Sequence, residues 1–376
     1  MPFFFNSTTN QHEGAVAIGE TVGAYDFDVF GGLITNEGTV AGPITALTDA
    51  NITLTSTEGA LISKAPGSKY ALDLQGNGAR FVINDGEIFG EVRFGNGWDT
   101  LSNTGTMTGR VDLGGGNDLV LNQSIPGSDG VQSAGLINGG LFTGAGNDTV
   151  LNSGTLRDVF LGDGADTYSA SFGGITGKGI AASVRGGTGN DTMTGGNDAD
   201  QLFGNDGDDR INGGGGNDKI GGGTGNDLIW GGARNDRIGA GAGDDTIDGG
   251  TGNDQIWGAG GADLIDGGRG NDRLEGGSGA DTFVFGLRSG RDTITDFGLG
   301  DRIEIVQQVA DAATFADILA HATEINESTT IDLGGLFNDL GFASLNTGTS
   351  RITLQGVEIS ELDSFMFNID DVFAVG

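Results

Sequence analysis

The sequence predicts an all-β protein, a parallel β-solenoid that ends in a small C-terminal cap containing one short helix. Three observations favour this fold class. Glycine accounts for 76 of the 376 residues and proline for only 4, a composition typical of many tight turns between short strands. Aspartate recurs at every ninth position from Asp191 to Asp281. A looser repeat of about 19 residues precedes this array, and a fixed period is the mark of a repeat architecture.

Residues 1–29 are expected to form an N-terminal cap, because the first coil of a solenoid exposes an apolar face that needs cover. A docking surface for a partner is the alternative. The segment is rich in aromatic residues: Phe3, Phe4, Phe5, Tyr25 and Phe27.

Residues 30–185 are predicted to form a right-handed parallel β-helix. Each repeat unit contributes two short alternating strands around Asn or Gly turns, and longer excursions are expected at 43–80 and 122–140. The pattern resembles the passenger β-helices of autotransporters and the helical domains of some polysaccharide enzymes. The repeat units lie at 34–42, 83–101, 102–121 and 151–168.

Residues 186–284 consist of eleven consecutive nonapeptides with the pattern GGxGxDxUx, where U is apolar. The glycines permit positive φ and direct successive carbonyl oxygens toward one point, while the aspartate adds a carboxylate. Ca²⁺ binds six to eight such oxygens. The U side chains should point into the core: Met193, Leu202, Ile211, Ile220, Ile229, Ile238, Ile247, Ile256, Ile265, Leu274 and Phe283.

This nonapeptide closely resembles the RTX (repeats-in-toxin), hemolysin-type calcium repeat. The resemblance implies a β-roll with two nonapeptides per turn and ions between repeats i and i+2, about seven to nine in all. One column of ligands would contain Asp191, Asp209, Asp227, Asp245, Asp263 and Asp281. The other would contain Asp200, Asp218, Asp236, Asp254 and Asp272.

Several repeats depart from the pattern. Asp198 and Arg234 replace the fourth-position glycine, and Asn205 and Ala259 replace a second-position one. Arginine tolerates a left-handed backbone poorly, so the site beside Arg234 is expected to be the weakest.

Four turns in the first half also end in aspartate and resemble isolated calcium half-sites. An in-phase neighbour two nonapeptides later is not present in every case, so a plain turn is the alternative. The aspartates are Asp99, Asp118, Asp148 and Asp166, and the apolar residues after them are Leu101, Val120, Val150 and Tyr168.

The formal net charge of −34 argues against nucleic acid or an anionic membrane as partner and favours stoichiometric binding of cations. Cysteine is absent, so bound calcium, in place of disulfide bonds, would stabilise the fold. No secretory signal peptide is recognised at the start, and no apolar run is long enough to cross a membrane.

Residues 285–376 are expected to form a C-terminal cap and secretion signal. A helix is predicted near 312–325, because Phe315, Ile318, Leu319 and Ala322 recur at helical spacing. The segment and its acidic-then-apolar tail resemble the C-terminal domain of serralysin-type proteases. That resemblance implies export by a type I secretion apparatus.

No catalytic constellation is found. The two histidines, His12 and His321, leave no HExxH motif, and no GxSxG motif occurs. The sequence therefore predicts a non-catalytic extracellular or cell-surface protein that binds Ca²⁺ and self-assembles into a surface layer, filament, sheath or biofilm matrix. A lyase or epimerase on the β-helix, with YDFDVF at 25–30 as a faint candidate, and a monomeric calcium-dependent adhesin are the alternatives. A homo-oligomer or polymer and a cell-surface polysaccharide are the expected partners.

Overall fold

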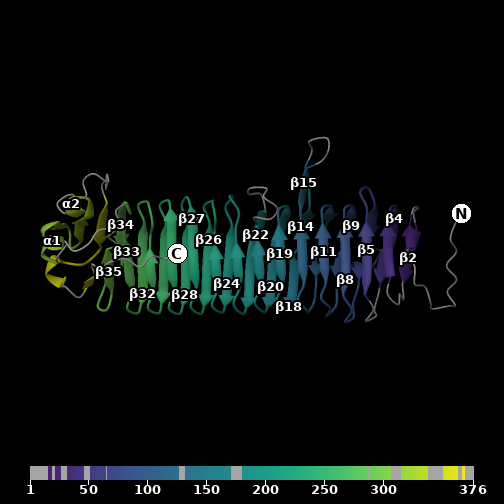
Figure 1. Ribbon diagram of the computed structural model, residues 1–376, viewed down its shortest axis with the longest axis horizontal. Coiled ribbons are helices and arrows are strands. Elements are labelled where there is room, and N and C mark those ends of the chain that lie inside the picture. The colour runs from purple at the N-terminus through teal and green to yellow at the C-terminus, as the bar shows by residue number, and fades with distance from the viewer. Residues whose placement is uncertain are drawn as a thin grey trace. The chain divides into compact units, whose positions relative to one another are not determined.

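The computed structural model describes residues 16–18, 22–26, 32–45, 51–64, 66–126, 132–170, 180–286, 288–305, 315–337, 350–362 and 366–368. The chain divides into two compact units, Met1–Gly196 and Asn197–Gly376. In each unit, short strands follow one another as successive coils of a parallel β-solenoid (Figure 1). The predicted all-β solenoid is therefore confirmed.

One sheet of the first unit takes one strand from every coil, and its neighbouring strands are parallel and in register. The coil through β5 was expected to be an excursion over 43–80. β5 does belong to the stacked coils, because it pairs with both β3 and β8. The step from β5 to β8 is nevertheless long: Ile52 pairs with Arg80, 28 residues on, whereas Gly32 pairs with Ile52, 20 residues on. The strands are β1 (Val16–Ile18), β3 (Gly32–Asn36), β5 (Ile52–Ser56), β8 (Arg80–Asn84), β11 (Thr100–Asn103), β14 (Leu119–Asn122), β19 (Thr149–Asn152), β21 (Thr167–Ser169) and β23 (Thr192–Thr194).

The opposite side of the first unit is built from continuous strands at both ends and split strands between them. The continuous strands are β2 (Val22–Asp26), β4 (Thr39–Thr45), β20 (Thr155–Asp163) and β22 (Ile180–Thr188). The split pairs are β6 (Leu61–Ser63) with β7 (Tyr70–Asp73), β9 (Glu87–Phe89) with β10 (Glu91–Arg93), β12 (Thr106–Met107) with β13 (Val111–Asp112), and β17 (Leu136–Ile137) with β18 (Leu141–Ala145).

The excursion predicted at 122–140 is present. It contains an antiparallel pair, β15 (Ser124–Pro126) with β16 (Gln132–Ala134), which stands apart from the coils (Figure 1). The chain thus leaves the solenoid after β14 and returns to it at β17.

From Asp200 to Asp281 the second unit repeats every 18 residues. Leu228 pairs with Thr246, and Lys219 with Arg237, so two nonapeptides make one coil. One sheet contains β25 (Arg210–Asn212), β27 (Leu228–Ala233), β29 (Thr246–Thr251), β31 (Leu264–Asp266), β33 (Thr282–Phe285), β35 (Arg302–Ile305) and β39 (Phe367–Asn368). The other contains β24 (Gln201–Asp206), β26 (Lys219–Thr224), β28 (Arg237–Ala242), β30 (Gln255–Gly260), β32 (Arg273–Ser278), β34 (Arg291–Ile294) and β38 (Arg351–Leu354).

The core is the inward row of apolar side chains. All eleven U residues of the array, from Met193 to Phe283, are at most 3% exposed. Leu101, Val120, Val150 and Tyr168 are at most 1% exposed. Strand alternation thus places these residues where the sequence predicted them.

The C-terminal part contains two short helices, α1 (Phe315–Ala320) and α2 (Leu333–Phe337), and a 3-10 turn, η4 (Ile359–Glu361). The helix expected near 312–325 ends at Ala320, earlier than predicted. Ala322 belongs to β36 (Ala322–Glu324), which pairs antiparallel with β37 (Thr329–Asp332), and this pairing takes the backbone out of the helix. Residues Phe3, Phe4 and Phe5 and the tail from 369 lie outside the described residues.

Candidate metal centre

The aspartates of the second unit stand in two columns, and one hydrogen bond repeats along each. The backbone N–H of each aspartate donates to Oδ1 of the aspartate 18 residues later, at N to O distances of 2.7–3.0 Å. The columns are Asp200, Asp218, Asp236, Asp254 and Asp272, and Asp209, Asp227, Asp245, Asp263 and Asp281. The structure therefore brings together the pairs that the sequence placed side by side.

Both columns continue beyond the predicted array. The Asp272 N–H donates to Asp292 at 2.9 Å, and the Asp281 N–H donates to Asp301 at 3.1 Å. Sequence analysis missed these two residues because the spacing lengthens from 18 to 20 residues. The signal that could have revealed Asp292 is local, since Gly290, Asp292 and Ile294 keep the GxDxU order.

The four aspartates predicted in the first half form a column with the same bond, which leads to Asp191. The N–H of Asp99 donates to Asp118 at 2.8 Å, that of Asp118 to Asp148 at 2.7 Å, that of Asp148 to Asp166 at 2.7 Å, and that of Asp166 to Asp191 at 2.8 Å. The sequence separations of 19, 30, 18 and 25 residues hid this column. Between Asp118 and Asp148 the extra residues form β15 and β16 outside the coil, so the loops themselves remain stacked.

The loops before these aspartates need glycine because they are stacked closely. Gly114 and Gly116, before Asp118, have φ of +97° and +118°. A Cβ on Gly116 would collide with the carbonyl oxygen of Gly97 in the neighbouring loop. Arg234 takes the same kind of backbone conformation, with φ of +82°, so its loop keeps its shape at the cost of strain.

The second carboxylate oxygen, Oδ2, is buried and accepts no hydrogen bond at most of these aspartates. An ionised carboxylate has only acceptor sites, and burying a charge without compensation is costly. A cation would supply that compensation. The aspartates concerned are Asp99, Asp118, Asp148, Asp166, Asp218, Asp227, Asp236, Asp245, Asp254, Asp263, Asp272, Asp281 and Asp292.

Burial also raises the pKa of these groups, because desolvation disfavours the ionised carboxylate. The pKa of Asp118 rises to about 8, and those of Asp218 and Asp254 rise to about 7. The neighbouring carboxylates in the same column raise the pKa further, whereas a backbone N–H that donates to each carboxylate lowers it. The stacked, buried carboxylates therefore destabilise the ion-free fold when they are ionised. A positive ion between the loops would remove this destabilisation.

Beside Oδ2 lies a carbonyl oxygen of the same column's next coil. A Cβ built on Gly213 would lie 2.6 Å from Asp218 Oδ2 and 2.5 Å from the Gly231 carbonyl oxygen. One built on Gly231 would lie 2.8 Å from Asp236 Oδ2 and 2.6 Å from the Gly249 carbonyl oxygen. Oδ2 and a carbonyl oxygen therefore approach the same glycine, and both are the hard oxygens that Ca²⁺ binds. Across the described residues no three His, Cys, Asp or Glu side chains converge on one point, so carbonyl oxygens would supply most ligands.

Arg80 shows that such a loop holds a cation. The segment Gly76, Asn77, Gly78, Ala79, Arg80 carries arginine where the next loop carries Asp99, and the Arg80 N–H donates to Asp99 Oδ1. Arg80 is 1% exposed. Its guanidinium donates to the carbonyl oxygens of Leu74, Gln75 and Gly78 at 3.0, 2.8 and 2.7 Å. Carbonyl groups of a GxGx loop therefore converge on a positive charge in this molecule.

A column of buried asparagines, which sequence analysis missed, closes the other end of the first-sheet strands. The side-chain amide of Asn84 donates to Asn103 at 2.8 Å, that of Asn103 to Asn122 at 2.8 Å, and that of Asn122 to Asn152 at 2.9 Å. All four residues are fully buried. An amide both donates and accepts, so this column needs no ion.

The remaining candidates do not form a recognisable catalytic site. Tyr25 and Asp26 of the YDFDVF segment belong to β2, and residues 27–30 lie outside the described part. His321 bonds through Nδ1 to the Asp317 carbonyl oxygen at 2.9 Å, and His12 lies outside the described residues. In the described residues no helix has the length and apolar character to span a membrane.

Residues 185–220, 221–256 and 257–287 match the family model of the RTX calcium-binding nonapeptide repeat. The predicted resemblance of the array to RTX repeats is thereby confirmed, and this segment is a calcium-binding RTX region. The predicted resemblance of the C-terminal region to serralysins stays a prediction. Comparison with curated protein sequences found no match.

The chain is similar in part to several solved structures, including three described below. A hyperactive, Ca²⁺-dependent, β-helical antifreeze protein from an Antarctic bacterium is 20% identical, with 81% of this chain and 88% of that chain covered and a TM-score of 0.46. The AlgE6R3 subunit of the Azotobacter vinelandii mannuronan C5-epimerase is 27% identical over 38% and 82%, with a TM-score of 0.29. The extracellular lipase LipA from Serratia marcescens is 20% identical over 55% and 45%, with a TM-score of 0.26.

Proposed function

We propose that this protein is a secreted, non-catalytic structural protein that folds on binding extracellular calcium and then self-assembles. The observation that carries the proposal is the stacked aspartate column, in which buried Oδ2 atoms without hydrogen bonds lie beside carbonyl oxygens. A bound calcium ion would supply two positive charges and accept a flexible shell of six to eight oxygens. About seven to nine ions in residues 186–284 would offset much of the net charge of −34.

The first-unit column is proposed as a second set of sites. Asp99, Asp118, Asp148 and Asp166 have the same backbone bond and the same partnerless Oδ2 as the array. Each follows a GxGx loop. The oxygen donors of these loops are of the kind that calcium binds. The number of calcium ions bound per chain measures how many of these sites are occupied.

Export is proposed to precede folding. RTX repeat proteins are typically secreted, and the array matches that family. Where calcium is scarce, the like charges of the columns oppose compaction, and an unfolded chain suits passage through a type I apparatus. Outside, millimolar calcium would drive folding because ion binding is coupled to it.

Self-assembly into a layer, filament, sheath or matrix is proposed because solenoid coils fill most of the described chain and leave flat, repetitive surfaces. A monomeric adhesin and a carbohydrate-active enzyme are the competing functions. Negative-stain microscopy with light scattering, during titration from chelator into millimolar calcium, separates them. Ordered filaments or sheets that appear only with calcium support assembly, whereas a folded monomer at every calcium concentration contradicts it.

A matched pair of variants tests the site itself. Asp245 is buried in the column, while its neighbour Asp244 is exposed and accepts a bond from the Ala262 N–H. Asp245→Asn and Asp244→Asn remove the same charge from the same loop. We expect Asp245→Asn to lose at least one calcium by equilibrium dialysis and to fold at a several-fold higher calcium concentration. Equal effects of the two substitutions would mean that net charge alone, and not the column, governs binding.

A further inference from the structure

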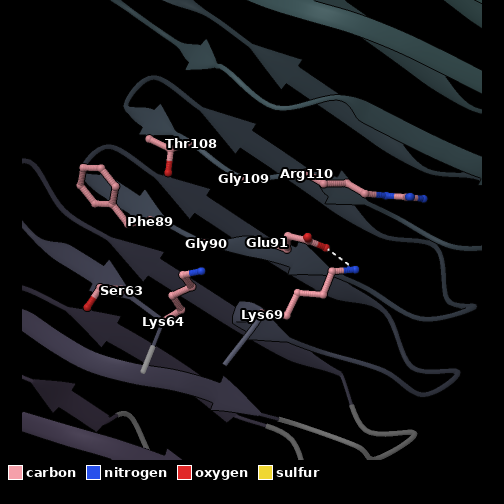
Figure 2. Close-up of a pocket in the computed structure, with 9 residues that line it drawn as sticks. All are labelled: Ser63, Lys64, Lys69, Phe89, Gly90, Glu91, Thr108, Gly109 and Arg110. Atoms are coloured by element: carbon pink, nitrogen blue, oxygen red, sulfur yellow. Dashed lines mark ion pairs between the residues drawn. The ribbon is translucent and has the colours of Figure 1, made fainter. Parts of the chain in front are cut away.

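A shallow hollow lies on the first unit where the split strands are joined. Its residues come from the links between β6 and β7, between β9 and β10, and between β12 and β13, which are three successive coils. Gly90, with φ of +133°, and Gly109 lie in these links, and a Cβ on Gly109 would meet the Gly90 carbonyl group. Figure 2 shows the residues that line the hollow: Ser63, Lys64, Lys69, Phe89, Gly90, Glu91, Thr108, Gly109 and Arg110.

The hollow contains three basic side chains, of which one has no acidic partner among the described residues. Lys64, Lys69 and Arg110 are three of the 18 basic residues of a protein with net charge −34. Lys69 pairs with Glu91 at 2.9 Å, and Arg110 pairs with Asp112 at 2.8 Å. Lys64 is exposed and forms no ion pair within the described part of the chain. Its ammonium group is therefore available to an anionic ligand.

Apolar and hydroxyl groups stand beside this ammonium. Phe89 is 42% exposed, although a phenyl ring gains from burial. The hydroxyls of Ser63 and Thr108 donate to the carbonyl oxygens of Val40 and Ile88 at 3.3 and 3.5 Å and keep acceptor capacity for a ligand. A ring face, a cation and hydroxyl groups together match the mixed chemistry of a sugar acid.

The hollow continues into an outward row of side chains, one from each following coil. Strand register places Arg93, Asp112, Phe142, Phe160 and Arg185 side by side. The rings of Phe142 and Phe160 stack at a centroid distance of 4.5 Å, and the Arg110 guanidinium lies 3.7 Å over Phe142. Strands are about 4.8 Å apart, so this row spans roughly 20 Å. A long, open strip of this kind suits an extended polymer better than a small molecule.

We propose that this hollow binds an acidic polysaccharide that carries carboxylate groups. One carboxylate pairs with the Lys64 ammonium, and the apolar face of a sugar ring covers Phe89. The polymer continues over the row toward Arg185. Nucleic acid fits less well, because its affinity depends on many phosphate contacts, whereas here one unpaired ammonium stands among ion pairs. The site is separate from the aspartate columns, so the proposal does not depend on self-assembly.

Binding of a uronic-acid hexasaccharide to the calcium-loaded full chain tests the proposal by isothermal titration calorimetry. A short oligomer is used because calcium itself binds carboxylates and cross-links long ones. We expect Lys64→Ala and Phe89→Ala each to weaken binding about tenfold, which is the loss of about one charged or stacking contact. Lys219→Ala is the matched control: Lys219 lies 5.3 Å over Phe203 in the second unit, and its loss should leave the affinity unchanged.

Two further probes give the outcomes that would overturn the site. A neutral glucose hexasaccharide should bind at least tenfold more weakly, and a single-stranded oligonucleotide should not compete. No binding of the uronate, equal binding of the neutral sugar, or tighter binding of the oligonucleotide would each refute the proposal. So would wild-type affinity in Lys64→Ala, provided circular dichroism shows the variant to be folded.

Discussion

The coils of the first unit and the coils of the array are closed in two different ways. In the first unit a strand such as β14 begins after Asp118 and ends at Asn122, so one turn carries a carboxylate and the other an amide. In the array both turns of each coil carry a carboxylate. Each amide can donate to the amide of the next coil, whereas stacked carboxylates repel and leave Oδ2 without a donor. Dependence on calcium should therefore be concentrated in the array.

Removal of calcium is the most direct test of the difference between the two regions. With chelator, we expect backbone amides of residues 200–281 to lose nearly all protection from hydrogen exchange. Amides near the asparagine column, at 100–122, should keep measurable protection, because their side-chain ladder needs no ion. Hydrogen exchange with mass spectrometry reads both regions in one sample. Loss of protection in both regions at the same calcium concentration would contradict the comparison.

Acid should partly replace calcium in the array. Burial raises the pKa of Asp218, Asp245 and Asp254 to about 7 in the folded chain, above the ordinary value of 3.8. The folded state thus binds more protons than the unfolded state between about pH 4 and 7, so the calcium-free fold loses stability as pH rises through this range. Urea unfolding in chelator should give a higher midpoint at pH 4.5 than at pH 8. Calcium affinity should change in the opposite direction, because protons compete for the same oxygens.

Substitution of Arg80 tests whether a calcium ion can replace a guanidinium group in the same kind of loop. In Arg80→Ala the carbonyl groups of Leu74, Gln75 and Gly78 lose a buried partner, and we expect a loss of about 3–5 kcal/mol in the free energy of unfolding. Arg80→Asp restores the loop pattern of the other coils. Its stability should recover in millimolar calcium, with one additional bound ion, while that of Arg80→Ala should not. Thermal unfolding with and without calcium distinguishes the two variants.

A single substitution interrupts the hydrogen bonds of the asparagine column. Asn122→Ala removes one of two acceptors of the Asn103 amide and one of two donors to Asn152 Oδ1, which keep Gly105 and Gly154 as partners. The lost bonds and the cavity should together cost about 2–4 kcal/mol. Asn96→Ala is the control, because Asn96 is exposed and bonds to another exposed residue. The loss in Asn122→Ala should be the same with and without calcium. A loss that vanishes in calcium would show that the amide column is coupled to the ions.

Arg234 carries the smallest expected effect. Arg234→Gly should stabilise the calcium-loaded protein by about 1 kcal/mol, because glycine adopts φ of +82° without strain. Arg269 occupies a loop position with no positive φ, so Arg269→Gly should stabilise nothing. Calcium midpoints of the two variants provide the measurement.

The array could be read from sequence because its period is constant, and every U residue proved to be buried. The remainder was hidden where the period varies. Separations of 19, 30 and 25 residues concealed the column from Asp99 to Asp191, and a step of 20 concealed Asp292 and Asp301. The asparagine column escaped notice because Asn at a strand end is also an ordinary turn residue. The hollow depends on which links face the same way, which only the three-dimensional stacking reveals.

The repeated bond from each aspartate to its counterpart one coil later has a consequence for the evolution of chain length. Every coil of the array offers the next one the same set of contacts, so whole coils can be duplicated or deleted without new interactions having to arise. Each such event would change the length of the array by about 4.8 Å. Gain or loss of a single nonapeptide would instead exchange the two columns and place the C-terminal segment against the wrong strand. The array can therefore change its length without exchanging the two columns only in steps of one whole coil.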